Sequence, residues 1–439
     1  MAMLKKFSKI LICIVIINFS ASKIECSNNL PVSYDLRNYG RVTEIKNQGI
    51  PGPCWAFAAL GSMESNWLTQ NPNTKKIPDL SEMQLAYYIY KDPDEFKNFT
   101  SRFTSGTLNR EGNVFMATAF LARLSGITDE KSLRYSGEGL KKLRAQKNSD
   151  NLKKYKRSLR LTGAYFLSSR NNPSETTRKN LVHDYGAIVI SMYSDPTKYH
   201  TINGKYTYFN NAHGNETNHD VLIIGWDDNF PKTNFLPNAN KNGAWLIKNS
   251  WGKLSGSNKG YFWLSYEQPI RGGTVFIASK DNSRLKHYGY DDLGWCGNAN
   301  YKYAANIFKF NSLQTLTEAG FYIPENDTEY ELEICDNGLE FPNAPNFGNL
   351  ISKLNGKIKY AGYHVINLPE KILIERGHYV SIKLKLPYSN MPVEVKRKNY
   401  SENFVVNKNQ SYFSNDNIMW VDGANLDEPI NACLKLFAY

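Results

Sequence analysis

The chain has 439 residues, too many for one small core, so two domains or one large domain with an appendage are expected. Apolar residues make up 41% of it and aromatic residues 13%, which excludes a disordered chain. The formal charge of +12 favours anionic partners such as cell-envelope polymers. No sequence motif for nucleic-acid binding accompanies this charge, so no nucleic-acid partner is expected.

The first 22 residues have the layout of a secretory signal peptide. Three lysines precede an uncharged run over 10–19, and small residues follow at 20–22. That run is too short to span a bilayer, and no later apolar run approaches membrane length. We therefore expect a signal peptide over 1–22 and a monomeric mature protein that is secreted, periplasmic or held at the cell surface.

Helical patterns dominate the next part of the chain. Small and apolar residues at helical spacing predict a helix that begins at Cys54, and a capping pattern at Ser81 predicts a second one. Further helices are expected near 114–124 and 174–184. The run 141–160 holds nine Lys and Arg residues against one Asp. We interpret it as a solvated face, with contact to an anionic polymer as the alternative.

Short apolar runs bounded by Gly, Asn and Pro follow the helices and predict strands. They lie at 187–192, 220–226, 244–248 and 260–266. Helices first and strands second favour an α+β fold whose halves form two lobes. After about 280–284 strand-like segments recur at intervals typical of an all-β sandwich or jelly roll. These segments are 305–310, 318–323, 330–335, 360–368, 379–386 and 417–422. The expected domains are 30–280 and 285–439.

One cysteine and one histidine stand where they can support nucleophilic catalysis. Cys54 lies at the expected start of a helix, whose dipole favours a thiolate, and a partner imidazole would raise the reactive fraction. His219 stands at the mouth of the apolar run in NHDVLIIGWDD, although taken alone it is more often a structural histidine. Asn249 ends the next strand, and its amide can orient the imidazole while Trp251 shields that bond from water. Gln48 and the Cys54 backbone N–H can donate to an oxyanion.

These residues lie in segments whose order resembles that of the papain family of cysteine proteases. The segments are LPVSYDLRNYGRVTEIKNQG, PCWAF, NHDVLIIGW and WLIKNSWG with GYFWLSY, over residues 30 to about 267. The resemblance implies a two-lobed papain-like fold with a helical lobe and a β-rich lobe. It implies that Cys54 is the nucleophile and His219 the acid and base, with Asn249 as orienter and Gln48 as oxyanion donor.

The same resemblance implies a substrate-binding set and shows some departures. Gly112 matches the glycine whose backbone meets extended substrate, Asn218 lies where the family lines its main specificity pocket, and Trp251 completes the set. Pro51 stands where the papain signature has a cysteine, so the early disulfide of plant and animal members is missing. The catalytic residues are also farther apart than in that signature, because of insertions such as DDNFPKTNFLPNANKN. Little room for a long inhibitory prosegment is expected before residue 30.

The C-terminal part resembles the lectin-like domain that follows papain-like proteases in some bacterial secreted and cell-surface proteins. Its aromatic residues Trp295, Tyr363 and Trp420 can stack on sugars, but packing in the core is the favoured interpretation. Asp291 and Asp292 can bind calcium, but a solvated turn is favoured. No metal or other cofactor is therefore predicted, and a glycan stays possible as a partner of this domain.

The favoured function is that of a cysteine endopeptidase acting on protein or peptide substrates through a thiolate–imidazolium pair and a thioester. One alternative is an envelope glycan-binding adhesin with an inactive protease lobe. Another is a transpeptidase that passes the acyl group from Cys54 to an amine.

Overall fold

The computed structural model describes residues 30–49, 53–89, 112–124, 127–144, 155–167, 173–252, 260–342, 346–397 and 404–439. The predicted signal peptide lies outside the described residues, as does the middle of the basic run, 145–154. The segment Val32–Tyr439 packs as one compact unit. Within the described parts of the chain, no helix combines the length and the apolar character needed to cross a bilayer.

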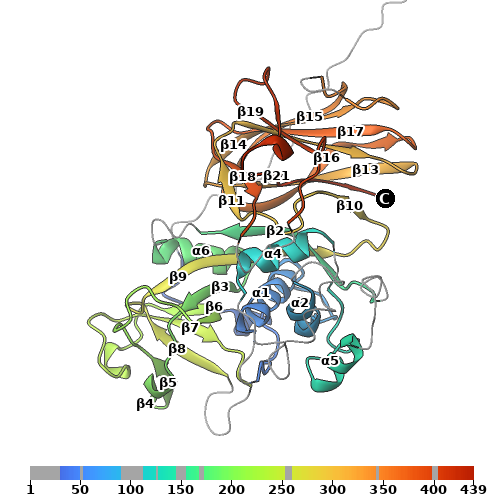
Figure 1. Cartoon of the computed structure of the whole chain (residues 1–439). Coiled ribbons are helices and arrows are strands. Elements are labelled where there is room, and N and C mark those ends of the chain that lie inside the picture. Colours follow the sequence, from blue (N-terminus) through green and yellow to red (C-terminus); the bar gives the residue numbers. More distant parts are fainter. Residues whose placement is uncertain are drawn as a thin grey trace, which may run out of the picture. The chain divides into compact units, whose positions relative to one another are not determined.

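The α-helices come early in the chain, as predicted (Figure 1). They are α1 (Cys54–Gln70), α2 (Glu82–Tyr88), α4 (Val114–Ala122), α5 (Gly137–Arg144) and α6 (Glu175–Tyr185). Short 3-10 turns also occur, namely η1 (Leu36–Tyr39), η3 (Pro196–Lys198), η4 (Lys232–Asn234) and η5 (Gly423–Asn425). The predicted helix starts at Cys54 and Ser81 are confirmed, and Ser81 accepts a hydrogen bond from the Gln84 N–H as a cap should. Helix α5 was not predicted.

Helix α1 is the central helix of the first half. Its residues are buried on nearly every face, which is the pattern of a helix inside a core. It packs against β6 and β9 on one side and against α2, α4 and α6 on others. At Gly61 a Cβ would come within 2.7 Å of the Leu222 side chain, so this glycine allows α1 to lie close to β6. The packing fixes the position of Cys54 at the head of the helix.

Strands of the first half belong to one long sheet. They are β1 (Ser33–Asp35), β2 (Leu159–Phe166), β3 (Ile188–Met192), β4 (Tyr199–Ile202), β5 (Lys205–Tyr208), β6 (His219–Asp227), β7 (Ala244–Lys248), β8 (Tyr261–Ser265) and β9 (Ile270–Lys280). The four predicted strands are confirmed as β3, β6, β7 and β8. Strand β6 pairs with β3 and β7 in antiparallel fashion, so His219 begins a strand that has neighbours on both sides.

Strands make up the second half. They are β10 (Lys286–Tyr288), β11 (Gly297–Ala299), β12 (Tyr303–Lys309), β13 (Gln314–Ile323), β14 (Thr328–Asp336), β15 (Asn349–Ile358), β16 (Gly362–Ile374), β17 (Tyr379–Lys385), β18 (Met391–Glu394), β19 (Ser411–Ser414), β20 (Val421–Asp422), β21 (Asn431–Ala432) and β22 (Leu434–Ala438). The predicted strand 417–422 is wrong for most of its length, because Asp416 holds the Ile418 and Met419 N–H groups in a turn.

These strands belong to three sheets. A six-stranded sheet has the order β15-β14-β17-β12-β19-β20, and a three-stranded one has the order β11-β18-β21. The longest sheet runs β10-β22-β13-β16-β2-β9-β3-β6-β7-β8-β5-β4, with β1 paired to β6. A continuous apolar core lies between strands of the second half, including Phe310, Phe321 and Phe413. The α+β first half and the all-β second half agree with the predicted fold classes.

The longest sheet crosses from one half of the chain to the other. Strand β2 pairs with β16, with Tyr165 opposite Gly362, and with β9 on its other side (Figure 1). Arg160 on β2 donates two hydrogen bonds to the Glu318 carboxylate on β13, at 2.7 and 2.5 Å. The two expected domains are therefore joined by backbone pairing and by an ion pair rather than by a linker alone.

The end of the basic run is consequently not a solvated face. Arg160 is occupied by Glu318, and Arg157 forms an ion pair with Asp281 at 3.0 Å. The solvated interpretation is wrong for these two arginines, because each balances a carboxylate at the border between the halves. It holds for Lys141 and Lys142 on α5, which are exposed.

Candidate active site

Cys54 is the first residue of α1 and is partly buried. The backbone N–H of Asp220, on β6, donates to the Cys54 sulfur at 3.5 Å. Burial raises the pKa of the Cys54 thiol to about 11, and the Asp220 carboxylate adds to this rise. Backbone N–H groups, including those of Asp220 and Trp55, lower the pKa, as expected at a helix start. Burial thus opposes the predicted thiolate, while the helix start supports it.

The His219 ring is oriented by Asn249. The distance from His219 Nε2 to Asn249 Oδ1 is 2.9 Å, and both residues are buried. The Ser250 N–H also donates to this Asn249 atom, at 2.8 Å. Because a backbone N–H can only donate, the atom must be the amide oxygen, so Nε2 must donate to it. In the neutral ring the proton is therefore on Nε2, and Nδ1 keeps the lone pair that a base needs.

Trp251 covers this hydrogen bond, as predicted. Its indole stacks on the His219 ring, with 4.9 Å between centroids and an interplanar angle of 23°. Burial lowers the pKa of His219 to about 4, against the opposing effect of the Asn249 hydrogen bond. The imidazole is therefore neutral near pH 7 as long as the thiol keeps its proton.

The pKa shifts of Cys54 and His219 have the same physical cause. Burial disfavours a lone thiolate at Cys54 and a lone imidazolium at His219 alike. If the thiol proton moves to the imidazole, both charges form together and attract each other strongly at low dielectric. Transfer of the thiol proton to the imidazole would therefore let each new charge offset the burial cost of the other.

Gln48 is held by the residue that follows Asn249. The Ser250 hydroxyl donates to Gln48 Oε1 at 2.5 Å, and the Gln48 N–H donates to the Ser250 carbonyl at 2.7 Å. The Tyr135 hydroxyl donates to the Gln48 carbonyl at 3.0 Å. Since the amide oxygen faces Ser250, the side-chain NH2 group is the end that can donate to an oxyanion. Ser250 was not predicted, although its place in KNSWG next to Asn249 is a usable signal.

The structure brings together most of the predicted substrate-binding residues. Gly112 lies against the indole of Trp55, the residue that follows Cys54 in the chain, so closely that a Cβ there would overlap it. Asn218 is exposed next to His219, and its side chain bonds both backbone groups of Ser194. Gly112 thus contacts the residue after Cys54, and Asn218 precedes His219 in the chain.

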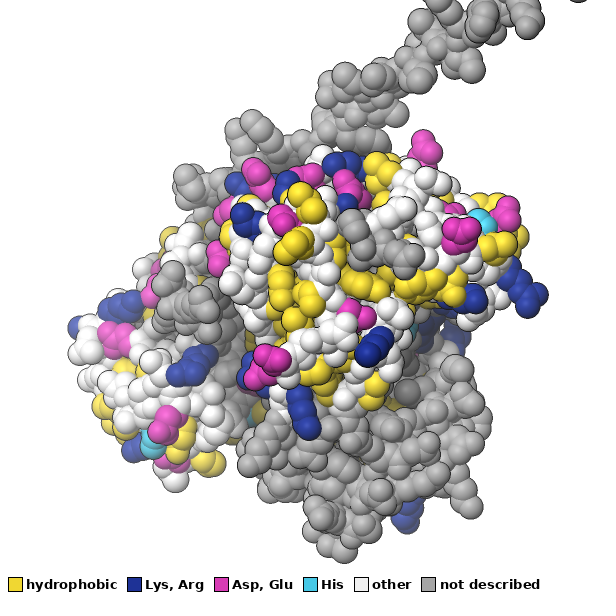
Figure 2. Space-filling model, turned by 45° about the horizontal axis from the view of Figure 1, so that its top comes forward, with side chains coloured by type: hydrophobic (Ala, Val, Ile, Leu, Met, Phe, Trp, Pro, Cys, Tyr) yellow, Lys and Arg dark blue, Asp and Glu magenta, His cyan; other side chains and the backbone are white. Residues whose placement is uncertain are grey.

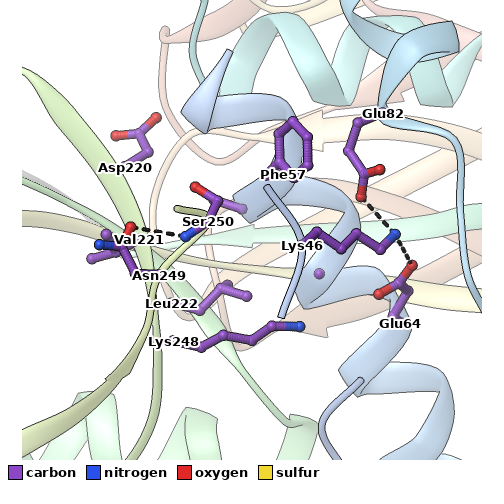
Figure 3. A pocket seen from close by; sticks show the side chains of 12 residues that line it. Lys46, Phe57, Glu64, Glu82, Asp220, Val221, Leu222, Lys248, Asn249 and Ser250 are labelled. Atoms are coloured by element: carbon purple, nitrogen blue, oxygen red, sulfur yellow. Dashed lines mark hydrogen bonds and ion pairs between the residues drawn. The ribbon is translucent and has the colours of Figure 1, made fainter. Parts of the chain in front are cut away.

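An ionic cluster, which the sequence did not reveal and most of which is buried, lies beside Asn249 and Ser250 (Figure 3). Lys46 Nζ contacts Glu64 at 3.0 Å, Glu82 at 2.7 Å and Asp79 at 2.9 Å. Lys248 Nζ donates to Thr43, whose hydroxyl in turn donates to Glu64 at 2.6 Å. These contacts form the Lys46 cluster, which comprises Thr43, Lys46, Glu64, Asp79, Glu82 and Lys248.

The Lys46 cluster ties together the segments that carry the site. Lys46 stands two residues before Gln48, Lys248 stands directly before Asn249, and Glu64 lies on the helix that begins with Cys54. Burial raises the pKa of Glu82 to about 8, opposed by Lys46, and lowers the pKa of Lys248 to about 8, opposed by Glu64. Each of these buried charges would be unfavourable alone, and each is stabilised by oppositely charged neighbours.

The candidate sugar-stacking residues take part in packing instead. Tyr363 is fully buried, Trp295 lies against Phe115 and Phe166 of the first half, and Trp420 lies edge-on to Phe347. Packing was the favoured interpretation for all three. Figure 2 shows hydrophobic side chains in bands over one face of the molecule. Among all the described residues, the most exposed large hydrophobic side chains include Leu339, Leu373, Ile418 and Met419.

Asp291 corrects a prediction. It is buried and forms an ion pair with Lys435, so the favoured solvated turn is wrong for this residue. Burial raises the pKa of Asp291 to about 6, and Lys435 opposes the rise. Among the residues that the structure describes, no group of three or more His, Cys, Asp or Glu side chains is arranged to hold a metal ion.

Comparison with known proteins agrees with this geometry. The model of the papain family cysteine proteases matches residues 30–280, which is more than half of the chain, and the model of a lectin-like domain matches residues 287–438. A viral cathepsin of Heliothis zea nuclear polyhedrosis virus is 30% identical over 232 residues, which are 52% of this chain and 51% of that protein. Cysteine proteinase 15A of Pisum sativum is 27% identical over 264 residues, 60% of this chain and 65% of that protein. The matches thus span about half to two thirds of these relatives.

Two solved structures share the fold over almost the whole chain. Both are of Cwp84, a clostridial cysteine protease, one after propeptide cleavage and one of the cysteine protease and lectin-like domains of this surface layer associated protein of Clostridium difficile. Each has a TM-score of 0.75 at 24% identity; they cover 92% and 93% of this chain, and 98% and 89% of their own. The likeness extends through both halves, including the β-rich one. By its matched residues, this chain belongs to the papain family of cysteine proteases.

Proposed function

We propose that this protein is a cysteine endopeptidase. The observation that carries the proposal is the arrangement around Cys54. Its sulfur is 3.5 Å from the N–H of the residue after His219, and His219 Nε2 is 2.9 Å from Asn249 Oδ1. Asn249 leaves the lone pair of the imidazole on Nδ1, and Ser250 turns the NH2 end of Gln48 toward donation. Nucleophile, base, orienter and oxyanion donor are the parts that acyl transfer requires.

The proposed reaction begins with proton transfer from the Cys54 thiol to Nδ1 of His219. The sulfur then attacks the carbonyl carbon of a peptide bond, and the oxyanion accepts hydrogen bonds from the Gln48 side chain and the Cys54 N–H. When the C–N bond breaks, the imidazolium returns its proton to the leaving amine and a thioester remains. Water, deprotonated by His219, hydrolyses the thioester and restores the thiol. No metal or cofactor is part of this proposal.

The test uses the full chain with an unstructured protein such as casein. Wild type should cleave casein, and a thiol-directed epoxide should label Cys54 and stop cleavage. Cys54→Ala should abolish cleavage while far-UV circular dichroism stays unchanged. Cleavage by a folded Cys54→Ala variant would contradict the assignment. If wild type joined peptides instead of cutting them, as mass spectrometry would show, the transpeptidase alternative would replace it. A fully folded wild type that neither cleaves nor takes the label would favour an adhesin.

We also propose that the mature protein acts outside the cell or at its surface. Support comes from the signal-like first 22 residues and from the surface-layer association stated for the clostridial protein with the same fold. In this proposal the lectin-like domain contacts an anionic polymer or glycan of the envelope, with the exposed lysines of α5 as a second point of contact, and the protein is a monomer. Pull-down with purified cell-wall polysaccharide, repeated at high salt, tests the binding, and light scattering tests the monomer.

A further inference from the structure

Asp220 carries a carboxyl group next to the nucleophile. Its N–H is 3.5 Å from the Cys54 sulfur, and its Oδ1 accepts a hydrogen bond of 2.6 Å from the Ser191 hydroxyl on β3. Burial raises its pKa to about 6, and the Ser191 hydrogen bond opposes the rise. Among the described residues no Lys, Arg or His forms an ion pair with it. A partly buried carboxylate without a counter-charge is costly, so this arrangement calls for a cation from elsewhere.

Three basic residues that the structure describes near Asp220 do not pair with it. Figure 3 shows its side chain pointing away from Lys46 and Lys248. Arg271 is on the same sheet, since Ser191 pairs with Asp220 on one side and with Arg271 on the other. Two strand spacings, about 10 Å, separate the backbones of Asp220 and Arg271, which is more than the screening length of about 8 Å in physiological salt. Arg271 is also exposed and lines an open hollow of its own together with Glu216.

The position of Asp220 matters for the chemistry. Its carboxylate raises the pKa of the Cys54 thiol and so works against the attacking thiolate. A substrate whose positive charge contacts this carboxylate offsets its effect on the thiol pKa while the scissile carbonyl lies at the sulfur. The gain then appears in the acylation step and not only in binding.

We propose that Asp220 is a specificity-determining residue that binds the ammonium or guanidinium group of a Lys or Arg side chain close to the scissile bond. The inference rests on the proposed endopeptidase function and names its substrate class. A Lys or Arg side chain near the scissile bond can reach this carboxylate, because the scissile carbon must lie at Cys54 and such a side chain is long and flexible. Ser191 holds the carboxylate in place for this contact.

The test compares peptides that differ only in one residue near the scissile bond, Lys or Arg against Gln or Glu, with each flanking position varied in turn. Wild type should show a kcat/KM at least about tenfold higher for Lys or Arg than for Gln at one position, between the effect of an exposed pair and that of a buried one. In Asp220→Asn this ratio should fall to about twofold or less. Glu216→Gln, which removes an exposed nearby charge, should keep the wild-type ratio.

A second readout needs no substrate. The neutral reagent iodoacetamide alkylates the Cys54 thiolate, and its rate against pH should shift to lower pH in Asp220→Asn but not in Glu216→Gln. A purely structural role of Asp220 would move neither this profile nor the peptide ratio. A wild type that cleaves peptides without preferring Lys or Arg overturns the inference alone, whether or not any variant folds. A wild type that cleaves nothing and takes no epoxide label overturns the proposed function and this inference together.

Discussion

The hydrogen bond from His219 to Asn249 offers the sharpest test of the proposed chemistry. It is 2.9 Å long, buried and covered by the Trp251 indole, and it raises the pKa of the imidazole. A hydrogen bond to a charged group of this kind contributes about 1.5–3 kcal/mol. The imidazolium forms only when Cys54 gives up its proton. Asn249→Ala should therefore remove this amount of stabilisation from the thiolate–imidazolium state.

The expected result is a fall in kcat/KM of roughly 10- to 150-fold with little change in KM. The pKa of His219 should fall further, so alkylation of Cys54 by iodoacetamide near pH 7 should slow in parallel. Steady-state kinetics on one peptide and the alkylation rate against pH measure both effects. Urea unfolding must accompany them, because the Ser250 N–H also loses its acceptor.

Asn229→Ala is the matched control, because Asn229 is an exposed asparagine in the turn that follows β6. It should change kcat/KM by less than about twofold, as surface substitutions usually do. If a folded Asn249→Ala variant also stays within twofold of wild type in kcat/KM and in alkylation rate, the orienting role is refuted. The rest of the proposed mechanism would then need another group to hold the imidazole.

Three further predictions concern stability and use urea unfolding of the full chain. Lys46→Met leaves buried carboxylates uncompensated and should lower the free energy of unfolding by about 3–5 kcal/mol; a loss below about 1 kcal/mol would contradict the ionic role. Burial raises the pKa of Glu394 to about 8, so its protonated carboxyl contributes its full stability below pH ~4.5, and this stability is lost as the pH rises through 8. Glu394→Gln should remove up to about 1.4 kcal/mol per pH unit from the fall of the unfolding free energy with pH, and an unchanged pH dependence would contradict this prediction. A double-mutant cycle with Arg160→Met and Glu318→Leu should give a coupling energy of at least about 1 kcal/mol, whereas additive effects would show that the ion pair is not needed.

Sequence patterns predicted the parts of the site that are local. Cys54 at a helix start, His219 at a strand start and Asn249 at the next strand end each stand in a short segment whose secondary structure follows from its own residues. Packing then brings His219 to Asn249, and the N–H of the residue after His219 to the Cys54 sulfur. The order of helices and strands in the first half was predictable for the same reason.

The parts that were not predicted depend on partners far apart in the chain. Lys46 and Glu82 look like ordinary surface charges in sequence, and only the fold buries them against each other. Strand β2 was missed because its alternation of apolar and polar residues begins within a basic run, and Arg160 there reads as solvated until Glu318 is known to face it. Asp291 was misjudged likewise, because Lys435 lies at the other end of the second half.

The pairing of β2 with β16 has a consequence for how the protein is made. Tyr165 faces Gly362, so roughly 200 residues separate the two strands in the chain. During synthesis from the N-terminus, β2 presents an open edge until its partner emerges, and open edges are where strands of other chains can attach. The helices and strands that carry Cys54 and His219 are made before that moment, but the long sheet gains β16, β13 and β22 only after the C-terminal half has been made. A chain that is truncated before β16 would keep the edge of β2 unpaired, which favours aggregation.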